Sequence, residues 1–141
     1  IGSAIGSGAP TLLLLGDVSL LHDLSALANV RLATSPLVVA LVDNAGGRLF
    51  DQLPVAKLYA GKPETELWRT PPSCDFAQVA ALFGLDYQAP TTPDAIAAAT
   101  RAGLEKRGAT LVHLRVGATS AAELRNSVLA ALAADLERCG A

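Results

Sequence analysis

Short apolar runs and helical patterns alternate along the first third of the chain. Unbroken apolar runs over 11–15 and 37–42 stop at Gly or Asp, and such runs predict parallel strands buried on both faces. Between them, apolar residues recur at helical spacing and predict a helix over 19–33, with Ser19 as its amino cap. Strand, helix and strand in this order predict one right-handed crossover unit.

The rest of the chain continues this alternation after an irregular stretch. Residues 48–73 mix prolines with charges and show no period, so they predict a short turn of helix near 50–53 and then a long loop. The elements expected after it are a helix capped by Asp75 and ending at Gly84, a strand over 85–89, a helix from Pro93 to about Lys106, a strand over 110–116 and a closing helix from Ser120. The whole predicts an α/β fold of three layers, a mostly parallel sheet with helices on both faces, in which the closing helix covers part of the sheet.

Composition adds size, charge and compartment to this picture. The 141 residues fit one domain, and 51% hydrophobic but only 4% aromatic residues predict a core of Leu, Ala and Val. The net charge of −2, without a Lys/Arg cluster, argues against nucleic acid as a partner, and no apolar run approaches the roughly 20 residues of a membrane span. Cys74 and Cys139 lack metal-site spacing, and we expect free thiols in the reducing cytoplasm.

Polar residues follow the first two predicted strands at the point where each strand ends. Gly16 and Asp17 come after the first, and the run Asp-Asn-Ala-Gly-Gly over 43–47 comes after the second. Ligands of open parallel sheets bind outside the carboxyl ends of the strands, where the oxygens of Asp17 and Asn44 can meet. Magnesium prefers oxygen ligands and often shares them with a phosphate, while the Gly pair lets a main-chain carbonyl turn toward the ion. The spacing thus favours a magnesium and phosphate site, with an ordinary Gly-Asp turn as the alternative.

Three further groups of residues receive structural interpretations. His22 and Asp23 lie in the first turn of the predicted helix, where a carboxylate suits the helix dipole. His113 is interpreted as a partly exposed strand residue without a partner. Trp68 and Arg69 are interpreted as packing residues of the long loop, with a lid or a subunit contact as the alternative.

The two strand-end motifs together resemble a known signature. Gly16-Asp17, followed by Asp43-Asn44 and a Gly pair, resembles the Gly-Asp to Asn-Asn signature of thiamine-diphosphate-dependent enzymes. Within that superfamily, segments 16–24 and 44–54 look most like the 2-succinyl-5-enolpyruvyl-6-hydroxy-3-cyclohexene-1-carboxylate synthases of menaquinone biosynthesis, and the similarity covers essentially the whole chain. The resemblance implies the thiamine-diphosphate-binding fold. For the intact enzyme, it implies a transferase that decarboxylates 2-oxoglutarate and adds the succinyl unit to isochorismate.

The resemblance also implies roles for individual residues. The Mg²⁺ ligands would be the Asp17 carboxylate, the Asn44 side-chain oxygen and the Gly46 main-chain carbonyl. The residues implied to bind thiamine diphosphate are Gly16, Asp17, Ser19, Leu20, Asn44, Gly46 and Gly47, and those implied to line the substrate pocket are Leu49, Phe50 and Leu53. No catalytic residue is implied within this chain. The family usually has an unbroken Asn run, so Asp43 and Ala45 are departures that we expect to tune the site without removing its ligand.

Domain organisation follows from the same resemblance. Residues 1–141 would be a partial diphosphate- and magnesium-binding domain, and residues 1–8 read as the tail of a helix whose beginning is missing. The family's central domain and its pyrimidine-binding domain, which carries the cofactor-activating glutamate, are not in this sequence. Such a chain would be inactive alone, would need a pyrimidine-binding domain from the same or another chain, and would belong to a homo-oligomer. The alternatives are one half of a split thiamine-diphosphate decarboxylase and a noncatalytic α/β interaction domain.

Overall fold

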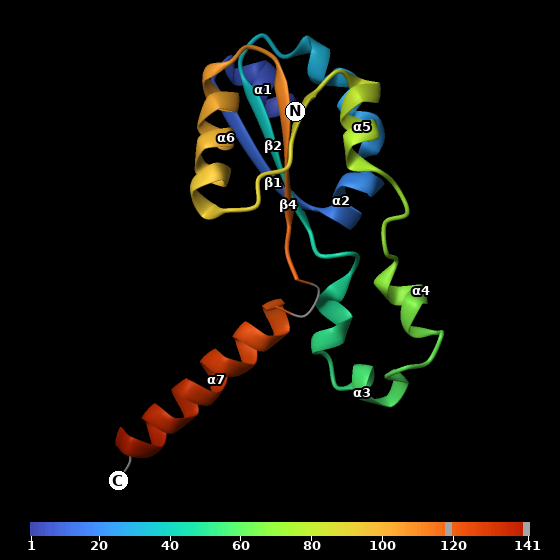
Figure 1. Ribbon diagram of the computed structural model, residues 1–141, viewed down its shortest axis with the longest axis vertical. Helices are drawn as coiled ribbons and strands as arrows, with labels where there is room; N and C mark the ends of the chain where they lie inside the picture. The colour runs from blue at the N-terminus through green and yellow to red at the C-terminus, as the bar shows by residue number, and fades with distance from the viewer. Residues whose placement is uncertain (118–119, 140–141) are drawn as a thin grey trace.

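The computed structural model describes residues 1–117 and 120–139 and centres on one parallel sheet (Figure 1). Its four strands are β1 (Thr11–Gly16), β2 (Leu37–Asp43), β3 (Asp86–Gln88) and β4 (Ala109–Arg115), and their spatial order is β1-β2-β4-β3. The α-helices are α1 (Gly2–Ser7), α2 (Asp17–His22), α3 (Val55–Tyr59), α4 (Thr65–Arg69), α5 (Phe76–Phe83), α6 (Pro93–Glu105) and α7 (Ser120–Cys139), and the 3₁₀ segments are η1 (Leu24–Leu32) and η2 (Arg48–Gln52). All neighbouring strands are parallel, which confirms the predicted sheet.

Helices cover both faces of the sheet, so the predicted three-layer arrangement is confirmed (Figure 1). The larger core lies between one face and the helical segments α1, α2, η1 and α5, where the alternate β2 residues Leu37, Val39 and Leu41 are fully buried. On the opposite face, α6 packs on Val38 and Val112, which are also fully buried. Because β2 is buried on both faces, it reads in the sequence as a continuous apolar run.

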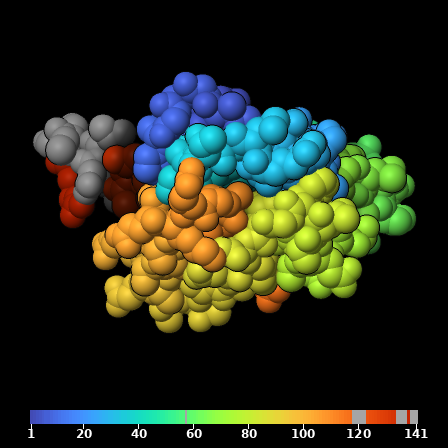
Figure 2. All heavy atoms as spheres, turned by 90° about the horizontal axis from the view of Figure 1, so that it is seen from above, coloured from blue at the N-terminus to red at the C-terminus, as the bar shows by residue number. Residues whose placement is uncertain are grey.

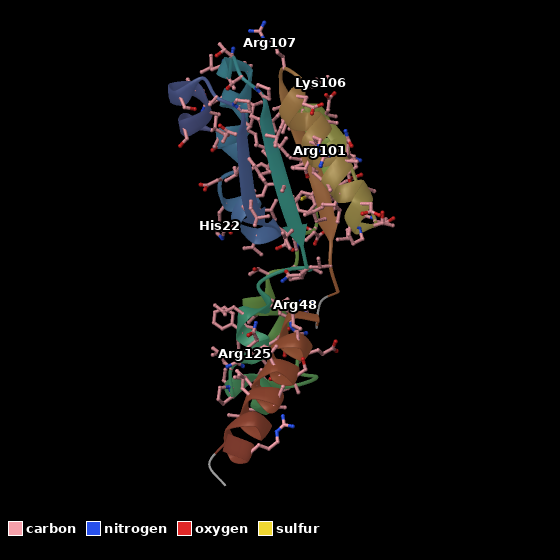
Figure 3. The ribbon with its side chains drawn as sticks, turned by 90° about the vertical axis from the view of Figure 1, so that its left-hand side faces the viewer. His22, Arg48, Arg101, Lys106, Arg107 and Arg125 are labelled. Atoms are coloured by element: carbon pink, nitrogen blue, oxygen red, sulfur yellow. The ribbon has the colours of Figure 1, made fainter. Side chains whose placement is uncertain are left out.

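The face under α6 is only partly covered. A Cβ built on Gly103 would lie 2.7 Å from a Val38 methyl and 3.3 Å from the Thr110 Cβ, so the helix approaches the sheet closely at that point. Figure 3 shows α6 in front of the β2–β4 side of the sheet, with no helix in front of β1. On this face of β1, Leu12 and Leu14 are 51% and 67% exposed. The apolar run that predicted β1 is therefore buried on one side only.

The amino ends of the central strands are tied together by the turns that precede them. The Leu37 N–H donates to the Gly108 carbonyl at 3.0 Å, and the Arg107 guanidinium reaches the Thr34 carbonyl. Figure 2, which views this edge, shows the segment before β2 packed against the turn before β4. These contacts fix the register in which Leu37 lies beside Ala109.

The prediction of a single helix over 19–33 is wrong, because two helical segments of different type occupy this stretch. Helix α2 starts at Asp17, with Gly16 as an amino cap that makes no side-chain bond, so Ser19 is not the cap. After α2 the chain continues as η1, in which Leu27 and Val30 are the buried residues. Residues three apart lie on one face of a 3₁₀ helix, which suits this spacing of core residues better than an α-helix.

The irregular stretch forms a separate lobe, residues 48–70, which we call the excursion. Figure 1 shows it beyond the carboxyl edge of the sheet. The predicted turn of helix is present as η2. The prediction of a long loop after it is wrong, because this stretch contains α3 and α4. Each of these helices has five residues, which is too short to produce a visible hydrophobic period.

The carboxyl-terminal half agrees with prediction except in the placement of its last helix. Asp75 caps α5 by accepting the Ala77 N–H at 2.8 Å, and Gly84 ends it with a left-handed φ of 72°. Helix α7 is present, but Figure 1 shows it projecting away from the sheet, with Leu124 and Val128 exposed. The prediction that it covers the sheet is wrong, because residues 123–133 of the helix are all exposed. In the described part of the chain, no helix combines the length and apolar character of a membrane span.

Candidate functional site

The two predicted strand-end loops meet at the carboxyl edge of the sheet. Strands β1 and β2 are paired so that Gly16 lies beside Val42, which brings the residues that follow them together. Asp17 is 2% exposed, and its two carboxylate oxygens accept N–H groups from Val18 at 2.8 Å and Gly46 at 2.7 Å. The two loops therefore converge at Asp17 and Gly46, whereas a meeting of the side-chain oxygens of Asp17 and Asn44 stays a prediction.

The loop after β2 adopts a conformation that requires glycine at one position. Asp43 Oδ1 accepts the Ala45 N–H at 3.0 Å, and Ala45 and Gly46 both have positive φ, 60° and 110°. A Cβ on Gly46 would lie 2.2 Å from the Arg69 carbonyl oxygen and 3.1 Å from the Pro71 Cα. Both the dihedral angle and the lack of space therefore exclude a side chain there. The Gly47 N–H donates to the same Arg69 carbonyl, which joins this loop to the excursion.

A buried histidine holds the other side of Asp43. His113 on β4 is 3% exposed, and its Nε2 lies 2.8 Å from Asp43 Oδ2. Its Nδ1 lies 2.8 Å from the Tyr87 hydroxyl on β3, and its ring packs edge-on against Phe76 of α5 at 5.2 Å between centroids. The interpretation of His113 as a partly exposed residue without a partner is wrong. Its side chain points into the larger core, beside the end of β2.

The site concentrates acidic groups in a largely buried space. Burial raises the pKa of Asp43, but interactions with the Ala45 N–H, the His113 ring and Asp17 outweigh this effect and hold the pKa below its ordinary value.

An acidic residue between two arginines holds the excursion together. Asp51 Oδ2 lies 3.2 Å from Arg48 Nη1, and Asp51 Oδ1 lies 2.9 Å from Arg69 Nε. The Nε of Arg48 also donates to the main-chain carbonyl of Asn44 at 3.2 Å. Figure 3 shows Arg48 just beyond the strand ends. This cluster, Arg48, Asp51 and Arg69, is called the arginine clamp below.

The remaining residues singled out from the sequence lie around this centre in different environments. Ser19 is exposed on α2, whereas the Leu20 side chain is buried in the larger core, so only its main chain is available to a ligand. Asn44 is half-buried, and the Gly46 carbonyl accepts the Arg48 N–H at 2.8 Å. The implied substrate-pocket residues Leu49, Phe50 and Leu53 are all exposed on or next to η2, so this chain does not enclose them.

The donor atoms at the carboxyl edge suit magnesium. In the described residues no cluster of three His, Cys, Asp or Glu side chains is suited to a metal, so a cation here would rely on amide, main-chain or phosphate oxygens as well. A carboxylate, an amide oxygen and a main-chain carbonyl form a hard oxygen set of the kind that Mg²⁺ shares with phosphates. The buried Asp17 has no basic partner among residues 1–117 and 120–139, which leaves its charge available to a cation.

The remaining structural interpretations concern His22, Asp23, Trp68 and the two cysteines. His22 and Asp23 are exposed, and His22 lies in the last turn of α2, so the first-turn interpretation is wrong. Trp68 packs edge-on against Tyr59 at 5.1 Å, as its packing interpretation predicted. Cys74 is a free thiol, as predicted, whereas the side chain of Cys139 lies outside the described residues.

Tyr87 and His113 are the residues that sequence reasoning missed. The available signal was the position of His113 two residues after Leu111 in a strand, which places both on one face. To use it, one must know that β4 lies beside β2, with His113 opposite Leu41, and neither strand order nor register is visible in one sequence.

Comparison with known proteins agrees with the fold. Residues 1–114 match the model of the thiamine pyrophosphate enzyme C-terminal TPP binding domain. The chain belongs to this family of thiamine-diphosphate-binding domains.

Within it, the chain is 40% identical over 129 residues to the 2-succinyl-5-enolpyruvyl-6-hydroxy-3-cyclohexene-1-carboxylate synthase of Edwardsiella ictaluri, covering 92% of this chain and 22% of that protein. It is 42% identical over 135 residues to the synthase of the same name from Sorangium cellulosum, covering 90% of this chain and 22% of that protein. The chain thus spans about a fifth of the length of the curated relatives that it matches.

Solved structures resemble this fold at low sequence identity. Benzoylformate decarboxylase from Polynucleobacter necessarius superposes with a TM-score of 0.66 at 15% identity, over 80% of this chain and 20% of that one. A thiamine-diphosphate-dependent 4-hydroxybenzoylformate decarboxylase from Rhodococcus jostii gives 0.65 at 20% identity, over 83% of this chain and 22% of that one. At such identities the likeness bears on the fold alone, and the predicted thiamine-diphosphate-binding fold is confirmed.

Proposed function

We propose that this chain is the thiamine-diphosphate- and Mg²⁺-binding part of a menaquinone-biosynthesis transferase, a 2-succinyl-5-enolpyruvyl-6-hydroxy-3-cyclohexene-1-carboxylate synthase. The intact enzyme would decarboxylate 2-oxoglutarate and add the succinyl unit to isochorismate. The observation that carries the proposal is the buried Asp17 carboxylate, held by the Gly46 N–H at 2.7 Å where two adjacent parallel strands end. The identity to synthases of that name over most of this chain supports the choice of reaction.

Binding of the cofactor would be shared among three residues at the strand ends. Asp17 supplies the charged ligand for Mg²⁺, while Asn44 and the Gly46 carbonyl supply neutral oxygens. Gly16, Ser19, Leu20 and Gly47 surround the position proposed for the diphosphate. When bound, thiamine diphosphate supplies the reactive carbon for the decarboxylation, since in cofactor enzymes the protein provides binding and orientation.

The exposed apolar residues of η2 would face the substrate. Leu49, Phe50 and Leu53 lie at or next to η2, soon after the Gly46–Gly47 turn, and the described residues leave them exposed. Large apolar side chains left exposed beside a polar site are typical of a surface that another domain completes. We infer that this cover is a pyrimidine-binding domain of the same or another chain, within a homo-oligomer. The free thiol of Cys74 agrees with a cytoplasmic protein.

Calorimetric titration with thiamine diphosphate, with and without MgCl₂, tests the proposal. We expect magnesium-dependent binding by the 141-residue chain and its loss in Asp17→Ala. Asp23→Ala is the matched control, because it removes an exposed carboxylate from the same segment and should leave the affinity unchanged. An Asp17→Ala protein that binds as tightly as the wild type contradicts the proposed site.

A second titration separates a missing domain from a missing function. The chain is mixed with a separately produced pyrimidine-binding domain from one of the similar synthases, and the measurement is repeated. Binding only in the mixture supports the need for that domain. Binding in neither case contradicts the proposal and favours the noncatalytic interaction domain.

A further inference from the structure

The polar path from Tyr87 to Asp17 crosses the whole sheet, from β3 through β4 and β2 to the end of β1. Each step is a short hydrogen bond or one peptide unit. Tyr87 contacts His113 at 2.8 Å, His113 contacts Asp43 at 2.8 Å, Asp43 holds Ala45 at 3.0 Å, and the next residue, Gly46, holds Asp17 at 2.7 Å. We propose that Tyr87 and His113 are positioning residues, which fix the Asp43 carboxylate and through it the contact between Gly46 and Asp17 that the cation site needs. This inference rests on the proposed function.

The first step assigns the hydrogens on His113. An ionised carboxylate can only accept, so the nitrogen facing Asp43, Nε2, carries a hydrogen and donates it. In the neutral ring Nδ1 then accepts, and the Tyr87 hydroxyl is the donor that it meets. The Phe76 ring packs against the imidazole and restricts its rotation. Tyr87 thus selects the tautomer in which Nε2 of His113 donates a hydrogen bond to Asp43.

The second step concerns the two oxygens of Asp43. Oδ2 receives the His113 hydrogen, and Oδ1 receives the N–H of Ala45. Ala45 has a φ of 60°, a left-handed conformation that is unfavourable for a residue with a Cβ. The bond from its N–H to Oδ1 helps to hold it there. Without His113, the carboxylate can rotate about χ2 and release that bond.

The third step leads from Ala45 to the ligand. Because Gly46 follows Ala45 directly, its N–H direction depends on the dihedral angles of that left-handed residue. That N–H points at Asp17 Oδ2, and Val18 holds the other oxygen. The Asp17 carboxylate is therefore oriented from both sides, one of which depends on the path through His113. Partners of this kind behind a metal ligand typically change metal affinity by about 10–100-fold when removed.

If His113 only stabilised the core, its replacement should act like the loss of any other buried residue of β4. A control variant in the same strand tests this. Val112 is the adjacent residue of β4, is fully buried, and points to the opposite face under α6. Val112→Ala weakens the same strand without touching the path. The test compares His113→Asn, Tyr87→Phe and Val112→Ala in the full 141-residue chain.

The decisive measurement is amide hydrogen exchange of Ala45 and Gly46 without any ligand, followed by NMR. For a bond of ordinary strength we expect His113→Asn to speed exchange of both amides about tenfold beyond what its lower global stability explains, with a smaller change in Tyr87→Phe. Val112→Ala should speed exchange of these two amides only as far as its lower global stability explains. Equal behaviour of His113→Asn and Val112→Ala overturns the proposal, whether or not the chain binds cofactor.

A double-mutant cycle then tests whether His113 acts through Asp43. Magnesium-dependent affinity for thiamine diphosphate is measured by calorimetry in the preparation, chain alone or mixture, that binds it. We expect His113→Asn to weaken binding about 10–100-fold in the wild type but to have almost no further effect in an Asp43→Ala background. Equal losses in both backgrounds overturn the proposal. Absence of binding in every preparation counts against the proposed function alone, because the exchange measurement decides the positioning role independently.

Discussion

The Asp43–Gly47 loop and the excursion leave the sheet at the same edge but are held in opposite ways. In the loop, short bonds to buried partners fix the backbone, as the contacts of Asp17 with Gly46 and of Asp43 with His113 illustrate. The excursion is held together mainly by the arginine clamp, whose three residues all lie within it, and it leaves Leu58 and Leu67 exposed. The difference indicates that the chain itself holds the proposed cation-binding loop in place, whereas the exposed apolar side chains of the excursion agree with the proposed contact with another domain.

The largest expected effect comes from breaking the loop at Gly46. Gly46→Ala forces a Cβ to within 2.2 Å of the Arg69 carbonyl oxygen at a φ of 110°. Steric overlap and backbone strain should lower the free energy of unfolding by about 2–5 kcal/mol, measured by urea denaturation.

The control for that variant lies in the excursion. Gly61 also has a positive φ, 76°, but a Cβ there meets nothing within 4 Å. Gly61→Ala should therefore cost only about 1–2 kcal/mol, the strain of the left-handed backbone alone. Equal costs at the two glycines would mean that the loop is no tighter than the excursion.

A smaller effect is expected from releasing the arginine clamp. Asp51→Asn removes the charge that Arg48 and Arg69 share. Because all three side chains are partly exposed, the free energy of opening the excursion should fall by only about 1 kcal/mol. The excursion should open locally while the sheet stays folded, so trypsin should cleave faster after Arg69, which Thr70 follows. A clear fall in the urea midpoint of the whole chain would contradict this separation between excursion and sheet.

The smallest effect is expected on the exposed surface of the excursion. Leu67 is 76% exposed, so Leu67→Ser should change the free energy of unfolding by no more than about 0.5 kcal/mol. Leu41 on β2 is 0% exposed, and Leu41→Ala should cost about 2–5 kcal/mol in the same urea experiment. A substantial cost at Leu67 would show that the excursion packs more tightly in solution than its exposed side chains indicate.

The sequence was informative wherever local chemistry decides the structure. Apolar runs marked β1 and β2, and Asp75 and Gly84 marked both ends of α5. The pairing of Asp17 with the Gly46 loop followed from parallel strands ending at one edge. These predictions needed only periodicity, capping and the geometry of a parallel sheet.

The sequence was uninformative where contacts between residues far apart in the chain determine the structure. The burial of His113 depends on Phe76 and Tyr87, which come from α5 and β3, and no spacing rule connects them. Helices α3 and α4 are too short for a period. The substrate-pocket residues Leu49, Phe50 and Leu53 remain a prediction, because they are exposed and a pocket around them is not formed by the described residues.

Strand β1 has a consequence for the handling of this protein in solution. It is an edge strand of the described sheet, it pairs only with β2, and Leu12 and Leu14 are left bare on one face. Natural edge strands usually carry charges or prolines that discourage pairing between molecules, but β1 reads Thr-Leu-Leu-Leu-Leu-Gly. Because one edge of β1 is unpaired in the described sheet and its apolar side chains are exposed, we expect concentrated samples of this chain to associate along β1, which light scattering at increasing concentration would detect.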